Sequence, residues 1–233
     1  MNRTTTPARK PLSLVAVLVS ALLGLTLATG AASAHALGTA ETPHARHAAA
    51  SSPLAARNAF HDQMRKLWED HITWTRLAIV TFADGSAGFP ATAGRLLQNQ
   101  RDIGDAIAPF YGRAAGDQLT ALLHDHITIA VEVLQAAKAG DTRAFDAALT
   151  RWYANGNDIA DFLSAANPKS WPDALMRADM KTHLDQTLAE AAHELHGQYA
   201  SSVSDYEAIH THILMMADQL STGIVAQFPS RFR

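Results

Sequence analysis

Two short patterns containing residues that bind metals or carry protons each occur twice in the chain. Asp-His-Ile-Thr stands at Asp70–Thr73 and Asp125–Thr128, and Asn-x-x-Asp-Ile-x-Asp stands at Asn99–Asp105 and Asn155–Asp161. The two copies are 55 residues apart for the His and 56 for the first Asp. Patterns that recur in the same order at nearly the same spacing indicate an internal duplication. They define a candidate site, although no pattern specifies a reaction.

Three histidines lie in apolar stripes of predicted helices: His71, His126 and His183. His71 and His126 have apolar residues four positions before and three positions after them, a spacing that defines one helical face. His183 follows His126 by 57 residues and continues a stripe that includes Met180. We therefore expect one inward-facing histidine in each of three helices.

The second pattern adds polar groups beside these stripes. Asn99 and Asn155 fall within the apolar faces of their helices, whereas Asp102 and Asp158 border those faces. A third copy of the Asp position is expected about 54 residues after Asp158, where His212 stands.

His210 competes with His212 for that inward position. The two histidines are two residues apart, and residues at that spacing on a helix cannot both point inward. The sequence leaves open which of them faces the core.

Inward His and Asp side chains cost several kcal/mol unless they are paired or bound to something. A metal site would satisfy them, because imidazole and carboxylate suit zinc, iron, manganese or copper, and helix bundles hold such ions between facing helices. The predicted ligands, or the side chains that orient them, are His71, Asp102, His126, Asp158, His183 and His212.

A metal-free polar network would satisfy the same side chains by pairing them with each other. The protein would then be an envelope or extracellular structural or interaction module whose His and Asp residues organise the core.

A metal-dependent enzyme with an open coordination position is a third and less favoured interpretation. The Glu-x-x-His pattern of di-iron bundles occurs at Glu190–His193 without a second copy. No nucleophile elbow, phosphate loop or His-Glu-x-x-His motif is present. The sequence thus favours binding over catalysis.

Six predicted helices must position these groups. Apolar residues recur with helical periodicity, with almost no alternating strand pattern. The expected helices cover about 56–83, 90–109, 113–139, 141–166, 172–196 and 202–227. Their short connections favour antiparallel neighbours. We expect an all-α, six-helix, up-and-down bundle made of three pseudo-repeated hairpins, the third more diverged.

The first residues have the features of an export signal. Three basic residues precede an apolar run at 12–27, and Ala32-Ser33-Ala34 provides a cleavage pattern. We expect a signal peptide over 1–34, cleaved near Ala34, and a secreted or cell-envelope protein.

Composition indicates how the rest of the chain is divided into segments and which partners and sites are excluded. Residues 35–56 are rich in Ala, Thr, Ser, Pro and His and are expected to form a disordered linker, followed by the bundle at 57–233. Beyond the signal the formal net charge is −6, which does not suit nucleic acid or anionic lipid, and no apolar run predicts stable membrane insertion after cleavage. The absence of cysteine excludes disulfides, thiolate metal sites and lipobox attachment. No protein partner is indicated.

Five stretches of the sequence form a pattern of their own: LWEDHITWTR at 67–76, LQNQRDIG at 97–104, RWYAN at 151–155, Asn-Pro at 167–168 and FPSRF at 228–232. In these stretches the chain resembles a family of exported bacterial all-helical proteins to which no activity is assigned. The resemblance spans nearly the whole chain beyond the signal. It implies export and a helical fold but no reaction.

Overall fold

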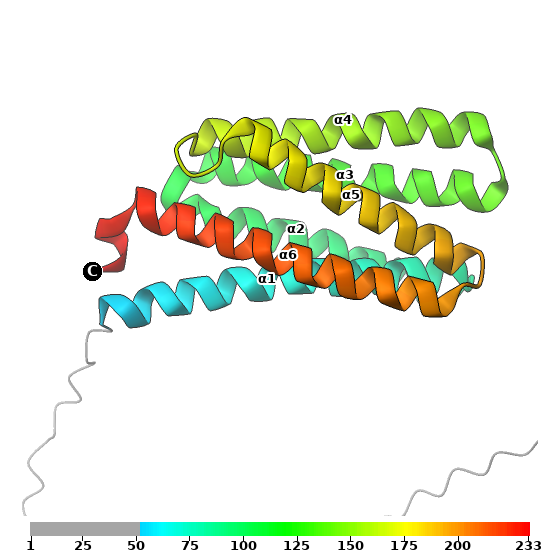
Figure 1. Ribbon diagram of the computed structural model, residues 1–233, viewed down its shortest axis with the longest axis horizontal. Helices are drawn as coiled ribbons and strands as arrows, with labels where there is room; N and C mark the ends of the chain where they lie inside the picture. The colour runs from blue at the N-terminus through cyan, green and yellow to red at the C-terminus, as the bar shows by residue number, and fades with distance from the viewer. Residues whose placement is uncertain (1–51) are drawn as a thin grey trace, which may run out of the picture. The chain divides into compact units, whose positions relative to one another are not determined.

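The computed structural model describes residues 52–233, which form six α-helices and one short 3-10 helix, η1, without a β-strand (Figure 1). The elements are α1 (Pro53–Ala83), α2 (Phe89–Tyr111), α3 (Arg113–Ala139), α4 (Thr142–Ala166), α5 (Asp173–Leu195), α6 (Tyr199–Gln227) and η1 (Pro229–Phe232). The prediction of an all-α fold with six helices is confirmed. The predicted signal peptide and most of the predicted linker lie outside the described residues.

Helix ends differ from the predicted ones by a few residues, for local reasons. α1 begins at Pro53 because proline suits the first helical turn and the Ser52 side chain caps it, so the last residues of the predicted linker are helical. α2 runs past Pro109, its predicted end, to Tyr111. Proline removes one backbone donor, but tertiary packing supports the last turn, where the Tyr111 ring lies 5.2 Å from that of Phe228.

Consecutive helices are antiparallel neighbours, and α6 also packs along α1, so the six helices close into a ring (Figure 1). α5 is oblique within this ring. It starts beside α4, and its other end approaches α1. No helix within residues 52–233 combines the length and hydropathy that a membrane span requires.

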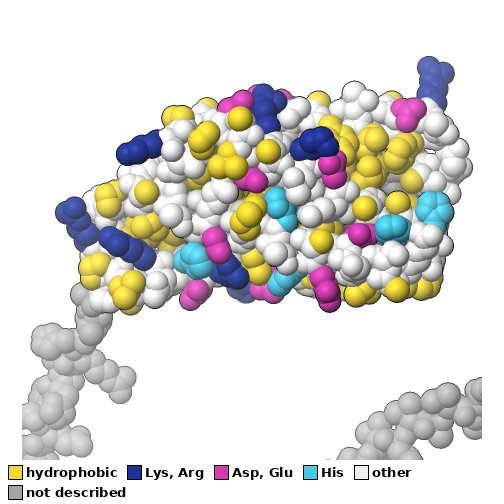
Figure 2. Space-filling view, in the orientation of Figure 1, with side chains coloured by type: hydrophobic (Ala, Val, Ile, Leu, Met, Phe, Trp, Pro, Cys, Tyr) yellow, Lys and Arg dark blue, Asp and Glu magenta, His cyan; other side chains and the backbone are white. Residues whose placement is uncertain are grey.

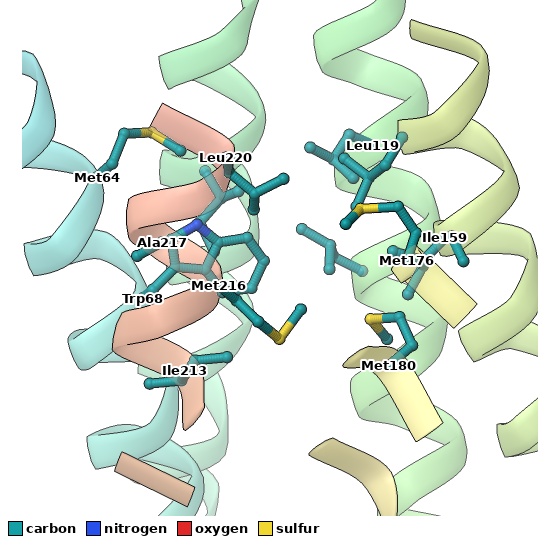
Figure 3. Packing of buried hydrophobic residues seen from close by; sticks show 14 of the residues in the cluster. Met64, Trp68, Leu119, Ile159, Met176, Met180, Ile213, Met216, Ala217 and Leu220 are labelled. Carbon is teal, nitrogen blue, oxygen red and sulfur yellow. The ribbon is translucent and has the colours of Figure 1, made fainter. Parts of the chain in front are cut away.

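The core repeats one register in the three odd-numbered helices. Each buries apolar side chains three and seven positions before its histidine: Trp68 and Met64 in α1, Leu123 and Leu119 in α3, and Met180 and Met176 in α5. Figure 3 shows Met64, Trp68, Leu119 and Met180 directed into the space between the helices. The even-numbered helices bury a matching series: Ile103 and Ile107, Ile159 and Leu163, and Met216 and Leu220.

The three predicted hairpins are not separate units, because helices from different hairpins pack closely too. α2 and α3 approach each other at Gly104 and Gly116. A Cβ atom on Gly104 would lie 2.5 Å from the Gly116 carbonyl oxygen, and one on Gly116 would lie 2.6 Å from the Gly104 carbonyl oxygen. Any larger residue would push these helices apart. The bundle is thus a continuous ring whose core register recurs three times.

Candidate functional site

Three buried histidines meet inside the bundle. His71 in α1, His126 in α3 and His183 in α5 expose only 2%, 3% and 4% of their surface. The ring centroid of His183 lies 5.7 Å from that of His71 and 6.2 Å from that of His126. The structure therefore brings together the three histidines that the sequence placed in the apolar stripes, and we refer to them as the triad.

Equivalent amide hydrogen bonds link α1 to α2 and α3 to α4 beside the triad. Asn99 Nδ2 donates to the Leu67 carbonyl oxygen at 3.0 Å, and Asn155 Nδ2 donates to the Leu122 carbonyl oxygen at 3.1 Å. In both pairs the accepting residue stands four positions before the triad histidine. The duplicated Asn residues thus fix how each even helix is placed against its odd neighbour.

His212 occupies the corresponding place between α5 and α6. Its Nε2 atom lies 3.0 Å from the carbonyl oxygen of Asp179, four residues before His183. His212 is therefore the third counterpart of the Asn position and not of the Asp position, which corrects the predicted alignment. His210, its rival, pairs instead with Glu69, with 3.1 Å between His210 Nε2 and Glu69 Oε1 in an exposed contact.

The orientation of two amides fixes the tautomers of two triad rings. The Asn155 nitrogen donates to a carbonyl oxygen, so its Oδ1, 3.0 Å from His126 Nδ1, accepts a hydrogen bond from the Nδ1–H group. The lone pair of this ring is therefore at Nε2. Gln100 Nε2 donates to the Leu96 carbonyl oxygen at 2.8 Å and lies 3.3 Å from His71 Nδ1. His71 Nδ1 is therefore the acceptor, and its Nε2 carries the proton.

The third ring has free hydrogen-bonding capacity. Within residues 52–233, His183 Nδ1 is buried without a hydrogen-bond partner, and so is Gln100 Oε1. An unpaired buried polar atom costs about 1–3 kcal/mol. In the same range of residues, the indole N–H groups of Trp68 and Trp152, whose rings contact His71 and His126, are also buried without a partner.

All three triad rings are neutral at pH 7. Burial, followed by repulsion from His126, lowers the pKa of His71 to about 3. Burial lowers the pKa of His126 to about 4, against an opposing hydrogen bond from Asn155. Burial and then repulsion from the other two rings place the pKa of His183 well below its ordinary value. Neutral imidazole is the form that binds metals.

The two aspartates predicted as ligands lie away from the triad. Asp102 accepts from Gln98 Nε2 at 3.0 Å and lies 3.4 Å from Arg95 Nη1, and Asp158 is exposed. Three residues turn a helix by about 300°, which places each Asp about 60° from its buried Asn, at the edge of the inward face, where Asp102 is half-buried and Asp158 is exposed. This corrects the predicted ligand set.

A second buried polar group, which the sequence did not predict, lies between α1, α5 and α6. Arg76 Nη1 lies 2.9 Å from Glu190 Oε1, and Arg76 Nη2 lies 3.3 Å from Glu194 Oε2. Ser202 donates to Glu194 at 2.6 Å and accepts from Arg76. We call these four residues the arginine–glutamate cluster. Burial raises the pKa of Glu190 to about 7, against the opposing effect of Arg76.

The spacing in α5 held a signal for this cluster. Steps of four, three and four residues put one face of α5 in line with the triad: His183, Thr187, Glu190 and Glu194. The Glu-x-x-His match at Glu190–His193 does not form one site, because His193 Nδ1 lies 2.5 Å from Asp205 Oδ2 instead.

The triad is not yet a set of metal ligands in its present geometry. Within the part of the chain that the structure describes, no group of three or more His, Asp or Glu side chains is already arranged to hold a metal ion. Three neutral imidazoles can either rotate to take up an ion or remain as a polar layer in an apolar core.

Comparison of the chain with protein-family models, with curated proteins and with solved structures gave no match.

Proposed function

We propose that the protein is exported and that its triad binds one transition-metal ion. The observation that carries this proposal is the meeting of three neutral, buried imidazoles from three helices, one of which, His183, has no partner at Nδ1. A core that only needed packing would be served as well by apolar side chains, because buried polar groups add cost unless they are satisfied.

Two of the three ring separations are close to those of imidazole ligands on one ion. Metal–nitrogen bonds of about 2.0–2.1 Å hold the centroids of two imidazole ligands roughly 5–6 Å apart. The 5.7 Å between His71 and His183 lies in that range, and the 6.2 Å between His126 and His183 slightly exceeds it. Rotation of His183 toward the other rings would close the difference without breaking a hydrogen bond at Nδ1.

The amide of Asn155 supports coordination through Nε2, whereas the amide of Gln100 would have to reorient. His126 already has its lone pair there, while Asn155 holds Nδ1–H in the way that orients metal-bound histidines. His71 must move its proton from Nε2 to Nδ1. A half-turn of the Gln100 amide would then present Oε1 to that N–H, with loss of the hydrogen bond from Gln100 Nε2 to the Leu96 carbonyl oxygen.

The ligand chemistry narrows the choice of ion. Imidazole suits zinc, copper and iron, whereas manganese prefers oxygen ligands, and Asp102 and Asp158 lie elsewhere. Because the chain contains no cysteine, no thiolate ligand is available. Apart from the methionine sulfur atoms, the softest ligands in the chain are the histidine nitrogen atoms. Export is supported by the signal-like residues 1–34, and cleavage near Ala34 would leave the bundle whole.

The test uses the chain purified without a polyhistidine tag. Bound metal is counted per chain after loading with zinc, copper or iron and removal of free ion, and melting is followed with and without chelator. We expect one ion per chain and a higher melting temperature, because a ligand at about one hundred times its Kd adds about 2.7 kcal/mol.

Two variants and a control locate the ion. His126→Gln and His183→Gln are expected to abolish uptake, whereas His124→Gln, in the same helix as His126 but exposed, should leave uptake unchanged. Circular dichroism confirms that each variant remains helical. If no ion binds and no added metal changes melting, the metal proposal is overturned.

The second candidate is a metal-free structural or interaction module whose triad is a polar layer. It is favoured by the Nδ1 hydrogen bonds that His71 and His126 already make. In that case His183→Leu should be neutral or stabilising, because a well-packed apolar residue would replace an unsatisfied one. A metal-binding triad would instead lose its ligand-induced rise in melting temperature.

A further inference from the structure

A surface cleft opens between α3, α4 and α5. Its volume is about 520 Å³, within the range of small-molecule sites. Its walls include Leu134 from α3, Phe145 from α4, and Leu188 and Leu195 from α5, all half-buried. Figure 2 shows hydrophobic side chains gathered over this end of α4 and α5. We call this space the outer cleft.

The outer cleft adjoins a smaller space inside the bundle. This inner cavity, of about 50 Å³, reaches Trp152, whose ring stacks on His126 at 5.3 Å between centroids. The two spaces share four wall residues: Val133, Leu134, Leu188 and Ala191. The two spaces are therefore neighbours along α3 and α5.

The inner cavity is narrow and mostly apolar. Its only polar lining side chains other than Trp152 are Thr75 and Thr187, and their hydroxyls already donate to the carbonyl oxygens of His71 and His183 at 2.7 and 2.8 Å. Within residues 52–233, the indole N–H of Trp152 is the one polar lining atom that is buried without a hydrogen-bond partner. A cavity of about 150 Å³ takes a benzene ring, so this one suits the end of a hydrocarbon chain and not a ring.

The charged groups that line the outer cleft are basic. Lys138 and His196 are its titratable lining residues, and no acidic side chain lines it. Lys138 Nζ donates to the carbonyl oxygens of Phe82 and Ala83 at 2.7 and 3.0 Å, which holds the ammonium in place with one donor left. A carboxylate at this position would meet a positioned positive charge.

We propose that the outer cleft binds a free amphiphile with an anionic carboxylate head and a single saturated chain, a fatty-acid-like ligand. The head meets Lys138 and His196. The chain lies against Leu134 and Leu188, and its end displaces the shared wall toward the inner cavity. This site uses no triad residue as a ligand contact, so it stands or falls independently of metal binding.

The test is a competition assay on the full chain. Fluorescence of 11-(dansylamino)undecanoic acid reports occupancy, and decanoate, decanol and decylamine compete below their micelle concentrations. We expect saturable probe binding at one site per chain, with decanoate displacing the probe most strongly and decylamine least. Absence of saturable binding, or equal displacement by decylamine and decanoate, overturns the proposal.

Matched variants locate the head and the chain. Lys138→Gln is expected to weaken decanoate binding roughly fivefold and to leave decanol unchanged, as a surface charge pair implies, whereas Lys169→Gln should change neither. Ala192→Trp should fill the outer cleft and abolish probe binding, whereas Ala165→Trp, on an exposed face of α4, should not. Unchanged probe binding in helical Ala192→Trp protein would place the ligand elsewhere and overturn the assignment.

A last experiment distinguishes a free ligand from a membrane lipid as the source of the bound hydrocarbon chain. Phosphatidylglycerol vesicles present the same acyl chains behind a phosphate head. We expect decanoate binding without co-sedimentation of the protein with vesicles. Co-sedimentation in the absence of decanoate binding would overturn the assignment to a free ligand.

Discussion

The triad and the arginine–glutamate cluster are both buried polar groups, but the free-energy cost of burying them is reduced in opposite ways. The triad gives up charge, because burial holds its three imidazoles neutral. The cluster pairs charge, with Arg76 between Glu190 and Glu194. The triad follows the register that recurs three times in the bundle, whereas the cluster occurs at one place in the ring, between α1, α5 and α6.

The comparison distinguishes buried groups at positions common to all three odd helices from a buried group that occurs at one interface. The positions of the triad exist in all three odd helices, and the cluster replaces apolar residues of the other repeats: Glu190 stands where α1 has Ala78 and α3 has Val133. A neutral layer common to the ring and a charged group unique to one interface should respond differently to acid and to substitution.

The largest expected effect is acid destabilisation through the triad. An unfolded histidine binds a proton below about pH 6.5, whereas the folded rings of His71 and His126 do so only near pH 3 and 4. The contribution of the triad to stability should therefore be complete above pH 6.5 and fall as pH drops toward 4, by up to about 1.4 kcal/mol per pH unit for each triad ring. Urea unfolding at pH 7.5, 6, 5 and 4, with chelator present, measures this.

A matched pair isolates the triad in that experiment. His71→Leu should reduce the pH slope, whereas His124→Leu, which removes an exposed histidine, should leave it close to that of the parent protein. An unchanged slope in His71→Leu would show that the rings are not the source of acid sensitivity.

The next effect concerns the cation of the arginine–glutamate cluster. Arg76→Met leaves two buried carboxylates without their partner and should lower the free energy of unfolding by about 3–5 kcal/mol. Arg151→Met removes an exposed pair with Glu132 and should cost at most about 1 kcal/mol. Urea midpoints at pH 7.5 compare them. Equal small losses would mean that Arg76 is effectively solvated.

Glu190 should show a pH dependence of opposite sign to that of the triad. Its pKa is raised in the folded state to about 7, so stability is lost as pH rises from about 4.5 through 7. Glu190→Gln removes this loss, and its advantage over the parent chain should be on the order of 1–3 kcal/mol greater at pH 8 than at pH 5. Urea unfolding at the two pH values gives the difference. A constant difference would contradict the raised pKa.

The smallest effect separates the two equivalent Asn residues. Asn155→Ala removes the side-chain donor to the Leu122 carbonyl oxygen, which keeps its helical N–H partner, and leaves His126 Nδ1–H without a partner. Asn99→Ala removes the side-chain donor to the Leu67 carbonyl oxygen and a long contact to Gln100. Each should cost about 1–3 kcal/mol, with Asn155→Ala the costlier by about 1 kcal/mol. Thermal unfolding of the two variants measures this gap, and equal losses would remove the special role of Asn155 beside the triad.

Local periodicity was sufficient to predict the helices and the inward placement of the triad histidines. It depends only on residues a turn apart, and so His71 and His126 could be placed from their apolar neighbours. It was not sufficient for Asp102 and Asp158, because a residue at the edge of a helical face turns outward when its neighbours offer a better charge partner, as Arg95 does for Asp102.

Features that depend on contacts among several helices could not be predicted from the sequence. The third alignment failed at His212 because few identities fix the offset between the second and third repeats, and the hydrogen bond to Asp179 supplied the missing constraint. The partners of Glu190 come from α1 and α6, and the outer cleft depends on the oblique course of α5. Neither follows from spacing within one helix.

The closing of α6 onto α1 has a consequence for chain order. η1 packs on both helices, and the Phe232 ring lies 5.3 Å from that of Phe60, so the last described residues touch the first helix. In a closed ring with a recurring register, each helix keeps two neighbours wherever the chain is cut. A circular permutant that joins Arg233 to Ser52 by a short linker and opens at Gly140 should therefore assemble the same bundle, with what is now the second half of the ring translated first.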